Sequence, residues 1–379
     1  MSLLSVFREN YQGEPIVVNA PGRINLLGEH LDYNLGQVMP SAIDKKIQFV
    51  TCASNTDSIS VNAFDLRESR SFKISELVPE RGWLTYLKGV VQGIKNRGIE
   101  IRGVHCVFGG NIPEGAGLSS SAALCCGFAF SLNEIFDLKL SRKDIAEIAQ
   151  FAEHEFARVK CGIMDQYASL FSEPDHLLLL DCRSMDHQLI PFKQEIFNIL
   201  LVDSKVKHSL ADSAYNDRRQ SCEEGVKILN SRYGKINSLR DASLAQLIDV
   251  RTEMGEVTFN RCEYVLREMG RVSRGVELLG KGDLKGFGRL MYSSHEGLSK
   301  SYEVSCVETD YLVDLAKDFG LIGSRMMGGG FGGCTINLVS KAQQDSFSEL
   351  VFSRYKNRFG IEPEIYEVKT ARGVHRLIE

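Results

Sequence analysis

The stretch Pro21-Gly-Arg-Ile-Asn-Leu-Leu-Gly-Glu-His-Leu-Asp-Tyr33 lies between two apolar segments, residues 15–19 (PIVVN) and 46–53 (KIQFVTCA). Both segments are rich in β-branched and apolar residues, which predicts two strands. The unusually polar segment 20–43 is predicted to connect them. A connecting turn needs Gly, Asn or Asp, but it does not need an Arg, a Glu, a His and an Asp within ten positions.

The chemistry of this polar stretch suggests a ligand with several hydroxyl groups. Closely spaced carboxylates and an imidazole can bind such groups at defined angles, which suits a polyol such as a sugar. The alternative interpretation is a solvated, charged loop. The candidate side chains are those of Arg23, Asn25, Glu29, His30 and Asp32.

A second stretch, Gly109-Gly-Asn-Ile-Pro-Glu-Gly-Ala-Gly-Leu-Ser-Ser-Ser-Ala122, follows the alternating segment 101–108, a predicted half-buried strand. The apolar, small-residue segment 122–136 after it is predicted to be a helix because of its length. Glycines let backbone N–H groups gather round an anion, and the serines lie at the positive end of the helix. The stretch lacks the Lys of a G-x-x-x-x-G-K-[ST] loop and the third glycine of a dinucleotide fingerprint. It is either a phosphate-binding loop or a helix cap.

Two further features each have a functional and a structural interpretation. Asp165, in Cys161-Gly-Ile-Met-Asp-Gln166, has apolar neighbours, so we expect it to be partly buried. A buried carboxylate must be paired, liganded or catalytic; the alternative is an N-cap for a helix at 166–171. The run Gly328-Gly-Gly-Phe-Gly-Gly333 permits positive φ or the close approach of a ligand, or it is a flexible hairpin turn.

A helix is predicted over residues 144–157, with a capping box at Ser141–Asp144 and one apolar face. Glu153 lies roughly 80° from the centre of that face, and Glu155 lies about as far away on the other side. Periodicity therefore does not decide which glutamate faces a site.

The remaining pattern is α+β, with strands and helices mixed but not alternating steadily. Several helices are predicted between about 209 and 320, and we place a domain boundary near 195, giving units 1–195 and 196–379. Further strands are predicted at 177–181, 197–203, 334–340 and 363–369, with a helix at 342–357.

Composition excludes several classes of protein. The 379 residues carry 45 basic and 49 acidic side chains, a net charge of −4, which offers no excess positive charge for nucleic acid. The sequence has no apolar run of about 18 residues, no secretion signal and no block of basic residues, so we expect no association with a membrane. The ten cysteines form no C-x-x-C pair, so we expect reduced, buried thiols in a cytoplasmic protein. We expect a monomer that binds small molecules.

Three of these motifs together resemble the GHMP family of small-molecule kinases. GRINLLGEHLDY at 22–33 resembles the signature of its galactokinase branch, IPEGAGLSSSA at 112–122 resembles the phosphate loop, and GSRMMGGGFGG at 323–333 resembles the C-terminal glycine motif. Secondary matches include Trp83-Leu-Thr-Tyr86-Leu-Lys-Gly89 and the segment 213–219. The resemblance covers essentially the whole chain. It implies an N-terminal domain of the ribosomal-protein S5 domain 2 type, a ferredoxin-like C-terminal domain, and an active site in the cleft between them.

The resemblance also implies roles for individual residues. Asp165 would be the general base for the anomeric hydroxyl of a sugar, or would position it, and Arg23 would stabilise the transferring phosphoryl group and keep Asp165 ionised. The implied sugar-binding residues are Glu29, His30, Leu31, Asp32, Gly162 and Tyr215. The implied ATP-binding residues are Gly115, Ala116, Gly117, Leu118, Ser119, Ser120 and Ser121, with Trp83 near the adenine. Ser121 and Glu153 would hold Mg²⁺.

Position 31 is Leu, where galactokinases usually carry Thr. The departure leaves open another anomeric sugar kinase, acting for example on N-acetylgalactosamine or arabinose. A non-catalytic galactose sensor of the same fold is expected to have lost phosphate-loop or base residues, which this chain retains. A nicotinamide-dependent oxidoreductase would need the G-x-G-x-x-G spacing of a dinucleotide-binding loop, which this chain lacks.

Overall fold

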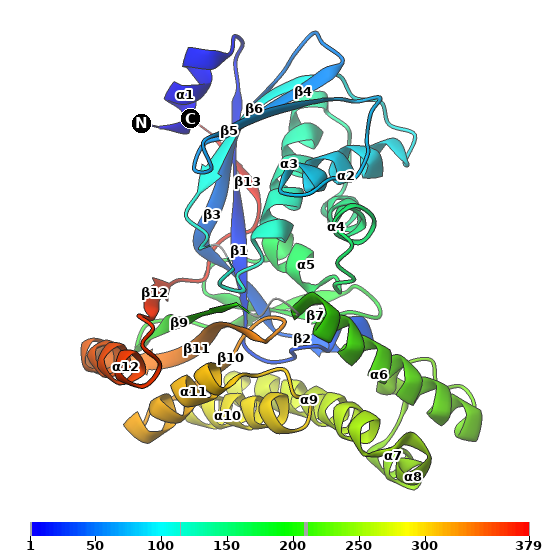
Figure 1. The fold of residues 1–379 in the computed structure, drawn as a ribbon, viewed down its shortest axis with the longest axis vertical. Helices are drawn as coiled ribbons and strands as arrows, with labels where there is room; N and C mark the ends of the chain where they lie inside the picture. The colour runs from blue at the N-terminus through cyan, green and yellow to red at the C-terminus, as the bar shows by residue number, and fades with distance from the viewer. Residues whose placement is uncertain (1, 114, 208–210, 379) are drawn as a thin grey trace.

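The computed structural model describes residues 2–113, 115–207 and 211–378. Residues 114 and 208–210, which belong to the predicted phosphate loop and to the start of the predicted helical region, lie outside the described residues. Figure 1 shows an upper part built on one sheet and a lower part built on a second sheet with long helices. The predicted α+β mixture is confirmed.

The upper sheet has six strands in the order β13-β1-β3-β6-β4-β5. Only the β4–β6 pair is parallel, and the other neighbours are antiparallel. The strands are β1 (Ile16–Asn25), β3 (Pro40–Ala53), β4 (Ser58–Ala63), β5 (Glu68–Lys73), β6 (Val104–Gly110) and β13 (His375–Leu377).

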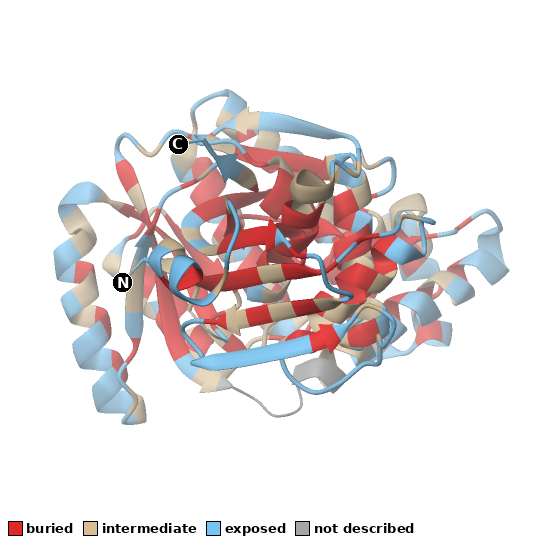
Figure 2. Cartoon of the chain, turned by 90° about the horizontal axis from the view of Figure 1, so that it is seen from above, coloured by how far each residue is buried: buried red, intermediate tan, exposed pale blue. Residues whose placement is uncertain are grey.

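The two faces of this sheet are covered by different helices (Figure 1). One face carries α2 (Leu84–Lys95), α3 (Ser120–Phe136), α4 (Arg142–Phe151) and α5 (Met164–Phe171), and the other carries α1 (Leu3–Asn10). The small residues of α3 allow it to lie close to the strands. A Cβ on Gly127 would lie only 2.3 Å from the Phe49 ring. Figure 2 shows buried residues gathered along the central strands.

The polar segment predicted to connect the first two strands is in fact partly strand. β1 continues to Asn25 and β3 begins at Pro40, and the two pair through Asn25↔Pro40 beyond a bulge at Pro21/Arg23. Charged residues at the end of β1 are compatible with a strand because they bond to other protein groups, as described below for Arg23. The polar residues of this segment therefore belong to a site, part of which lies at the end of β1 and part in the loop that follows it.

The predicted helix at 144–157 is α-helical only as far as Phe151. It continues as a π-helical turn, Ala152–Phe156, which we call the π-turn. The capping box of Ser141 and Asp144 at its start is confirmed.

The lower sheet is antiparallel throughout, in the order β10-β11-β9-β12. Leu200, Val202 and Val339 of the sheet pack against two helices in a separate core. The strands are β9 (Phe197–Lys207), β10 (Gly323–Met326), β11 (Gly332–Ser340) and β12 (Glu364–Val368), and the helices are α11 (Val307–Phe319) and α12 (Gln344–Phe359).

A small sheet and the remaining helices join the two parts. The strands of this sheet are β2 (Gln37–Val38), β7 (His176–Asp181) and β8 (His187–Pro191). The helices are α6 (Ala211–Tyr233), α7 (Leu244–Asp249), α8 (Arg251–Met254), α9 (Glu256–Gly280) and α10 (Leu284–Lys300).

The division of the chain near residue 195 stays a prediction. It falls between β8 and β9, but the chain returns to the upper sheet at its end, where β13 pairs with β1. All ten cysteines are free; Cys161 and Cys306 are half-buried and the others are buried. No helix within the described ranges is long and apolar enough to cross a membrane.

Candidate active site

A cavity of about 440 Å³ lies where the upper and lower parts meet. Its wall combines the end of β1, the loop that follows, the start of α3, the π-turn, α5, α6 and the glycine-rich turn between β10 and β11. The predicted residues that line it are Arg23, Glu29, His30, Asp32, Gly115, Gly117, Leu118, Ser119, Ser120, Ser121, Glu153, Asp165 and Tyr215. The fold therefore brings the separate motifs to one place.

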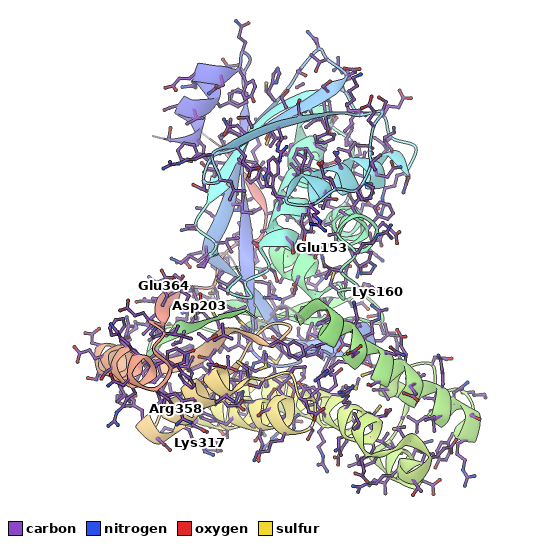
Figure 3. The ribbon with its side chains drawn as sticks, in the orientation of Figure 1. Glu153, Lys160, Asp203, Lys317, Arg358 and Glu364 are labelled. Carbon is purple, nitrogen blue, oxygen red and sulfur yellow. The ribbon has the colours of Figure 1, made fainter. Side chains whose placement is uncertain are left out.

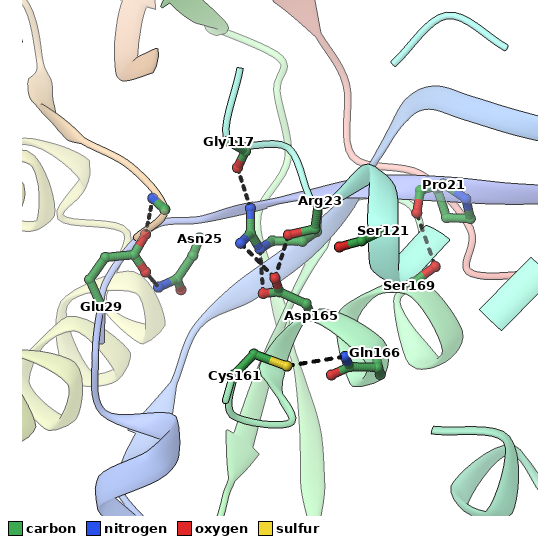
Figure 4. Close-up of polar contacts among 12 residues, drawn as sticks. Pro21, Arg23, Asn25, Glu29, Gly117, Ser121, Cys161, Asp165, Gln166 and Ser169 are labelled. Carbon is green, nitrogen blue, oxygen red and sulfur yellow. Dashed lines mark hydrogen bonds and ion pairs between the residues drawn. The ribbon is translucent and has the colours of Figure 1, made fainter. Parts of the chain in front are cut away.

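An ion pair between Arg23 and Asp165 lies in the middle of this wall (Figure 4). Arg23 Nε donates to Asp165 Oδ1 at 2.7 Å and Nη2 donates to Oδ2 at 2.9 Å, while Nη1 donates to the Gly117 carbonyl at 2.6 Å. Burial alone would lower the pKa of Arg23, but the charges of Asp165 and Glu29 raise it. Asp165 lies in the first turn of α5 and does not cap it, since the N-cap position is Ile163.

The phosphate-loop motif supplies the start of α3. Gly115 and Gly117 have φ of +70° and +75°, and Ser119 is the N-cap in a left-handed conformation. The Ser119 hydroxyl does not cap the helix but donates to Asp165 Oδ2. The first N–H groups of α3 are thus left without a side-chain cap beside the cavity, an arrangement that favours an anion.

Glu153 is the glutamate that faces the site. It is 5% exposed, whereas Glu155 is exposed and lies 3.9 Å from Arg158. The hydroxyl of Ser121 lies 3.3 Å from Glu153 Oε2, and Gln166 Nε2 donates to Oε1 at 3.0 Å. Burial, with the nearby charge of Asp165, raises the pKa of Glu153 to about 7. Figure 3 shows Glu153 just above the junction of the two parts.

The donors around Glu153 fit a hard divalent cation. Ser121 and Glu153 present oxygen atoms to the cavity, and Glu153 makes no ion pair with a basic side chain of the described residues. Mg²⁺ takes oxygen ligands and keeps several waters, so it needs few protein groups. Within the described residues no group of three His, Cys, Asp or Glu side chains forms a metal site.

Glu29 is held in a second buried ion pair, with Arg325 of β10. Arg325 Nη2 lies 3.0 Å from Glu29 Oε1, and the two side chains are 0% and 2% exposed. Arg325 also donates to the Asn25 carbonyl at 2.9 Å. The backbone N–H of Gly328 donates to Glu29 Oε1 at 2.5 Å, and Asn25 Nδ2 donates to Oε2. Sequence reasoning missed Arg325, although it lies inside the glycine motif, because nothing local indicates its partner.

His30 and Asp32 are buried beside this pair and have strongly shifted pKa values. Burial, together with the charges of Arg218 and Arg325, lowers the pKa of His30 to about 3. Burial and the charge of Asp165 raise the pKa of Asp32 to about 7. Asp32 can lie here because position 162 is glycine: a Cβ on Gly162 would be 1.9 Å from Asp32 Oδ2.

Aromatic side chains complete this end of the cavity. His30 Nδ1 lies 2.8 Å from the Tyr33 hydroxyl, which lies 2.7 Å from that of Tyr302. The ring of Tyr215 is 5.2 Å from that of His30 and lines the cavity. Neutral hydrogen-bonding groups, carboxylates and ring faces therefore surround one small volume, as a sugar requires.

Five predicted residues do not line the cavity, among them Asn25, which is fully buried and donates to Glu29. Leu31 and Ala116 are fully buried in the core, and Gly162 lies behind Asp32. Trp83 packs against the Phe108 ring and donates to Glu68 at 3.1 Å. The lining also contains residues to which sequence reasoning gave no role: Pro113, Arg158, Val159, Cys161, Met164, Asn216 and Phe331. Asn216 lies in the segment 213–219, whose resemblance to the family was the available signal.

Comparisons with known proteins agree with this geometry. The Galactokinase galactose-binding signature matches residues 5–51, the GHMP kinases N terminal domain matches 85–173, and the GHMP kinases C terminal model matches 276–357. The galactokinase of Thermosipho africanus is 40% identical over 361 residues, which cover 95% of this chain and 99% of that protein.

Solved structures share the whole fold. The crystal structure of Lactococcus lactis galactokinase complexed with galactose matches with a TM-score of 0.94 at 30% identity, covering 99% of this chain and 100% of that one. Methanococcus jannaschii mevalonate kinase has the same fold, with a TM-score of 0.68 at 20% identity, covering 96% and 100% of the two chains. The predicted GHMP kinase fold is confirmed, and the chain belongs to the galactokinase family of GHMP kinases.

Proposed function

We propose that this protein transfers the γ-phosphoryl group of ATP to the anomeric hydroxyl of D-galactose, giving α-D-galactose 1-phosphate and ADP. The observation that carries the proposal is the position of the Arg23–Asp165 pair. It lies between the carboxylates and rings of the loop after β1 and of α6, on one side, and the uncapped start of α3 on the other. A sugar hydroxyl and a phosphate chain can therefore meet at one ion pair.

The sugar is proposed to occupy the end of the cavity that Glu29, His30, Asp32 and Tyr215 surround. The galactose-binding signature matches residues 5–51, which include Glu29, His30 and Asp32. Glu29 and Asp32 accept hydrogen bonds from hydroxyls, and the Tyr215 ring covers an apolar face of the sugar. Gly162 contributes by leaving room for Asp32, and Leu31 contributes from the core beneath the signature.

The phosphates of ATP are proposed to lie along residues 115–121, with their charge at the start of α3. Ser121 and Glu153 would hold Mg²⁺, since their oxygen atoms face the same volume. When bound, Mg²⁺ would neutralise charge on the phosphate oxygens. Contact of Trp83 with the adenine stays a prediction.

The proposed reaction needs placement and charge stabilisation more than covalent participation of the protein. The anomeric oxygen forms a bond to the γ-phosphorus, the bond from that phosphorus to the bridging oxygen breaks, and ADP leaves. The hydroxyl proton passes to an Asp165 oxygen. Arg23 faces the charge that develops on the phosphoryl group, and the Ser119 hydroxyl fixes the orientation of Asp165. A weak base such as this carboxylate also serves by orienting the hydroxyl.

A coupled ADP-release assay tests the proposal. We expect Mg-ATP turnover with D-galactose, and little with glucose, N-acetylgalactosamine, arabinose or mevalonate. Turnover only on another sugar would overturn the proposed substrate, and binding of galactose without turnover would overturn the proposed catalysis. The cytoplasmic location and the monomeric state stay predictions.

The raised pKa of Asp32 predicts a pH dependence of sugar binding. An ionised carboxylate accepts hydroxyl hydrogen bonds more strongly than a neutral one, and the Asp32 pKa is raised to about 7. The ionised fraction therefore grows as pH rises through 7, and galactose affinity should increase. Below pH 7 affinity should fall by up to about tenfold per pH unit. His30, with a pKa lowered to about 3, stays neutral throughout this window.

Calorimetric titration of galactose between about pH 6 and 8, without nucleotide, measures this effect. Asp32→Asn should bind galactose more weakly and lose the pH dependence. A profile that Asp32→Asn shares with the parent protein would assign the titration to another group, and this prediction would be wrong. The charged groups that act on Asp32 are Asp165, Glu29 and Arg23, and the titratable groups Tyr33, Cys161, Cys182 and Tyr215 also lie near it; none of them is changed in this variant.

A further inference from the structure

Both candidate glutamates lie in the π-turn, and Glu153 is the one that lines the cavity. In it the backbone N–H of Ala157 bonds to the Ala152 carbonyl at 3.2 Å, five residues back, in place of the α-helical four. A regular helix would leave Glu153 and Glu155 equally far from the apolar face. In this wider turn Glu153 is buried and Glu155 is exposed. Single π-helical turns within α-helices are frequent at functional sites.

The π-turn packs directly against α2 at Gly89, the last residue of the segment Trp83-Leu-Thr-Tyr86-Leu-Lys-Gly89. An ideal Cβ on Gly89 would lie 2.7 Å from both Cα and Cβ of Ala152 and 3.1 Å from Cγ of Phe156. Ordinary Cβ contacts begin at 3.4 Å. Because a backbone Cα cannot rotate away, any side chain at position 89 must move the π-turn or α2.

We propose that Gly89 is a positioning residue. Because it has no side chain, the π-turn can pack close to α2, and this position keeps the Glu153 carboxylate beside Ser121. Ala152, which would meet the new atom, is the neighbour of Glu153 in the chain. Moving its Cα from 2.7 Å to 3.4 Å is a displacement of about 0.7 Å. We expect a displacement of that size to disturb the 3.3 Å contact between the Glu153 carboxylate and the Ser121 hydroxyl. The inference rests on the proposed role of Glu153 as a Mg²⁺ ligand.

Gly93 supplies a matched control, one helical turn further along α2. A Cβ there would meet only side-chain atoms within 3.4 Å, namely Ile148 Cγ2 at 3.1 Å and Phe151 Cδ1 at 3.3 Å. These side chains belong to α4, and they can give way by a few tenths of an ångström. Gly93→Ala therefore perturbs the packing of α2 without pressing on the backbone of the π-turn.

The experiment measures Mn²⁺ affinity by electron paramagnetic resonance, in the full-length protein with the β,γ-imido analogue of ATP. Gly89→Ala should raise the Kd for Mn²⁺ by at least about tenfold. Mutations of residues that position a metal ligand without binding the metal typically weaken metal binding by about 10- to 100-fold. Gly93→Ala should leave that Kd close to the parent value. Galactose affinity, measured by calorimetry, should change little in either variant because Glu153 does not contact the proposed sugar end.

Glu153→Gln separates this inference from the metal role on which it depends. Gly89→Ala should weaken Mn²⁺ binding no further when combined with Glu153→Gln, because both changes act on one carboxylate. Equal effects of Gly89→Ala and Gly93→Ala would overturn the inference alone. An unchanged Mn²⁺ Kd in Glu153→Gln would overturn the metal role and, with it, this inference. Should Gly89→Ala fail to fold, Ala152→Ser presses on the same contact from the π-turn and carries the same expectation.

Discussion

Asp165→Asn should lower kcat by at least about 10²-fold while the affinity for ATP is retained. Asparagine has nearly the shape of aspartate, and its side-chain oxygen can still accept a hydrogen bond from Arg23. It cannot take up the proton of the attacking hydroxyl, and it offers that hydroxyl no anionic oxygen. The loss should therefore appear in the chemical step and leave nucleotide binding at the start of α3 intact.

Single-turnover kinetics with galactose and ATP measure the effect, and calorimetry with the β,γ-imido analogue checks nucleotide affinity. Asp137→Asn is a suitable control, because Asp137 follows α3 on the surface and, among the described residues, forms an ion pair only with the exposed Lys139. Near-normal turnover in Asp165→Asn would show that the carboxylate neither accepts the proton nor orients the hydroxyl.

Arg325→Met should destabilise the protein by about 3–5 kcal/mol, the usual cost of removing one partner of a buried ion pair. Arg325 and Glu29 are 0% and 2% exposed and lie 3.0 Å apart. Methionine fills similar volume but leaves the Glu29 charge buried without its cation. The Asn25 carbonyl also loses its bond from Arg325. Since Glu29 lines the cavity, galactose affinity should fall together with stability.

Equilibrium unfolding in urea measures the stability change. Arg274→Met, which breaks an exposed ion pair with Glu277 on α9, should cost no more than about 1 kcal/mol. Adding Glu29→Gln to Arg325→Met should recover part of the lost stability, since it removes the unpaired charge. A cost for Arg325→Met as small as for Arg274→Met would mean that Glu29 is not ionised against Arg325.

The local pattern predicted much of the fold. Alternation and β-branched residues placed β1, β3 and β11 near their observed positions, and the capping box located the start of α4. These signals are local, because backbone hydrogen bonding and side-chain spacing within a few residues determine them. The predicted end of β1, at residue 19, was wrong. The strand continues to Asn25, and its polar side chains there are buried, although polar residues in a sequence usually indicate an exposed loop.

The candidate site was predicted unevenly. The signature and the phosphate loop indicated Arg23, Ser121 and their neighbours, and these residues line the cavity. Leu31 lies beside the signature in sequence but points into the core, so proximity in the chain did not indicate contact with the cavity. The choice between Glu153 and Glu155 required the π-turn, which regular helical periodicity does not describe.

The sequence by itself determined the chemical inventory of this protein: the carboxylates, the arginine, the serines and the flexible glycines, each in a recognisable local motif. Only the tertiary structure decided which of them pair. Arg23 and Asp165 are 142 positions apart, and Glu29 meets Arg325 across the junction of two sheets. The physical reason is that a buried charge takes its partner from whatever the packed chain brings within about 3 Å. That neighbour depends on long-range strand pairing and helix packing, which no local pattern encodes.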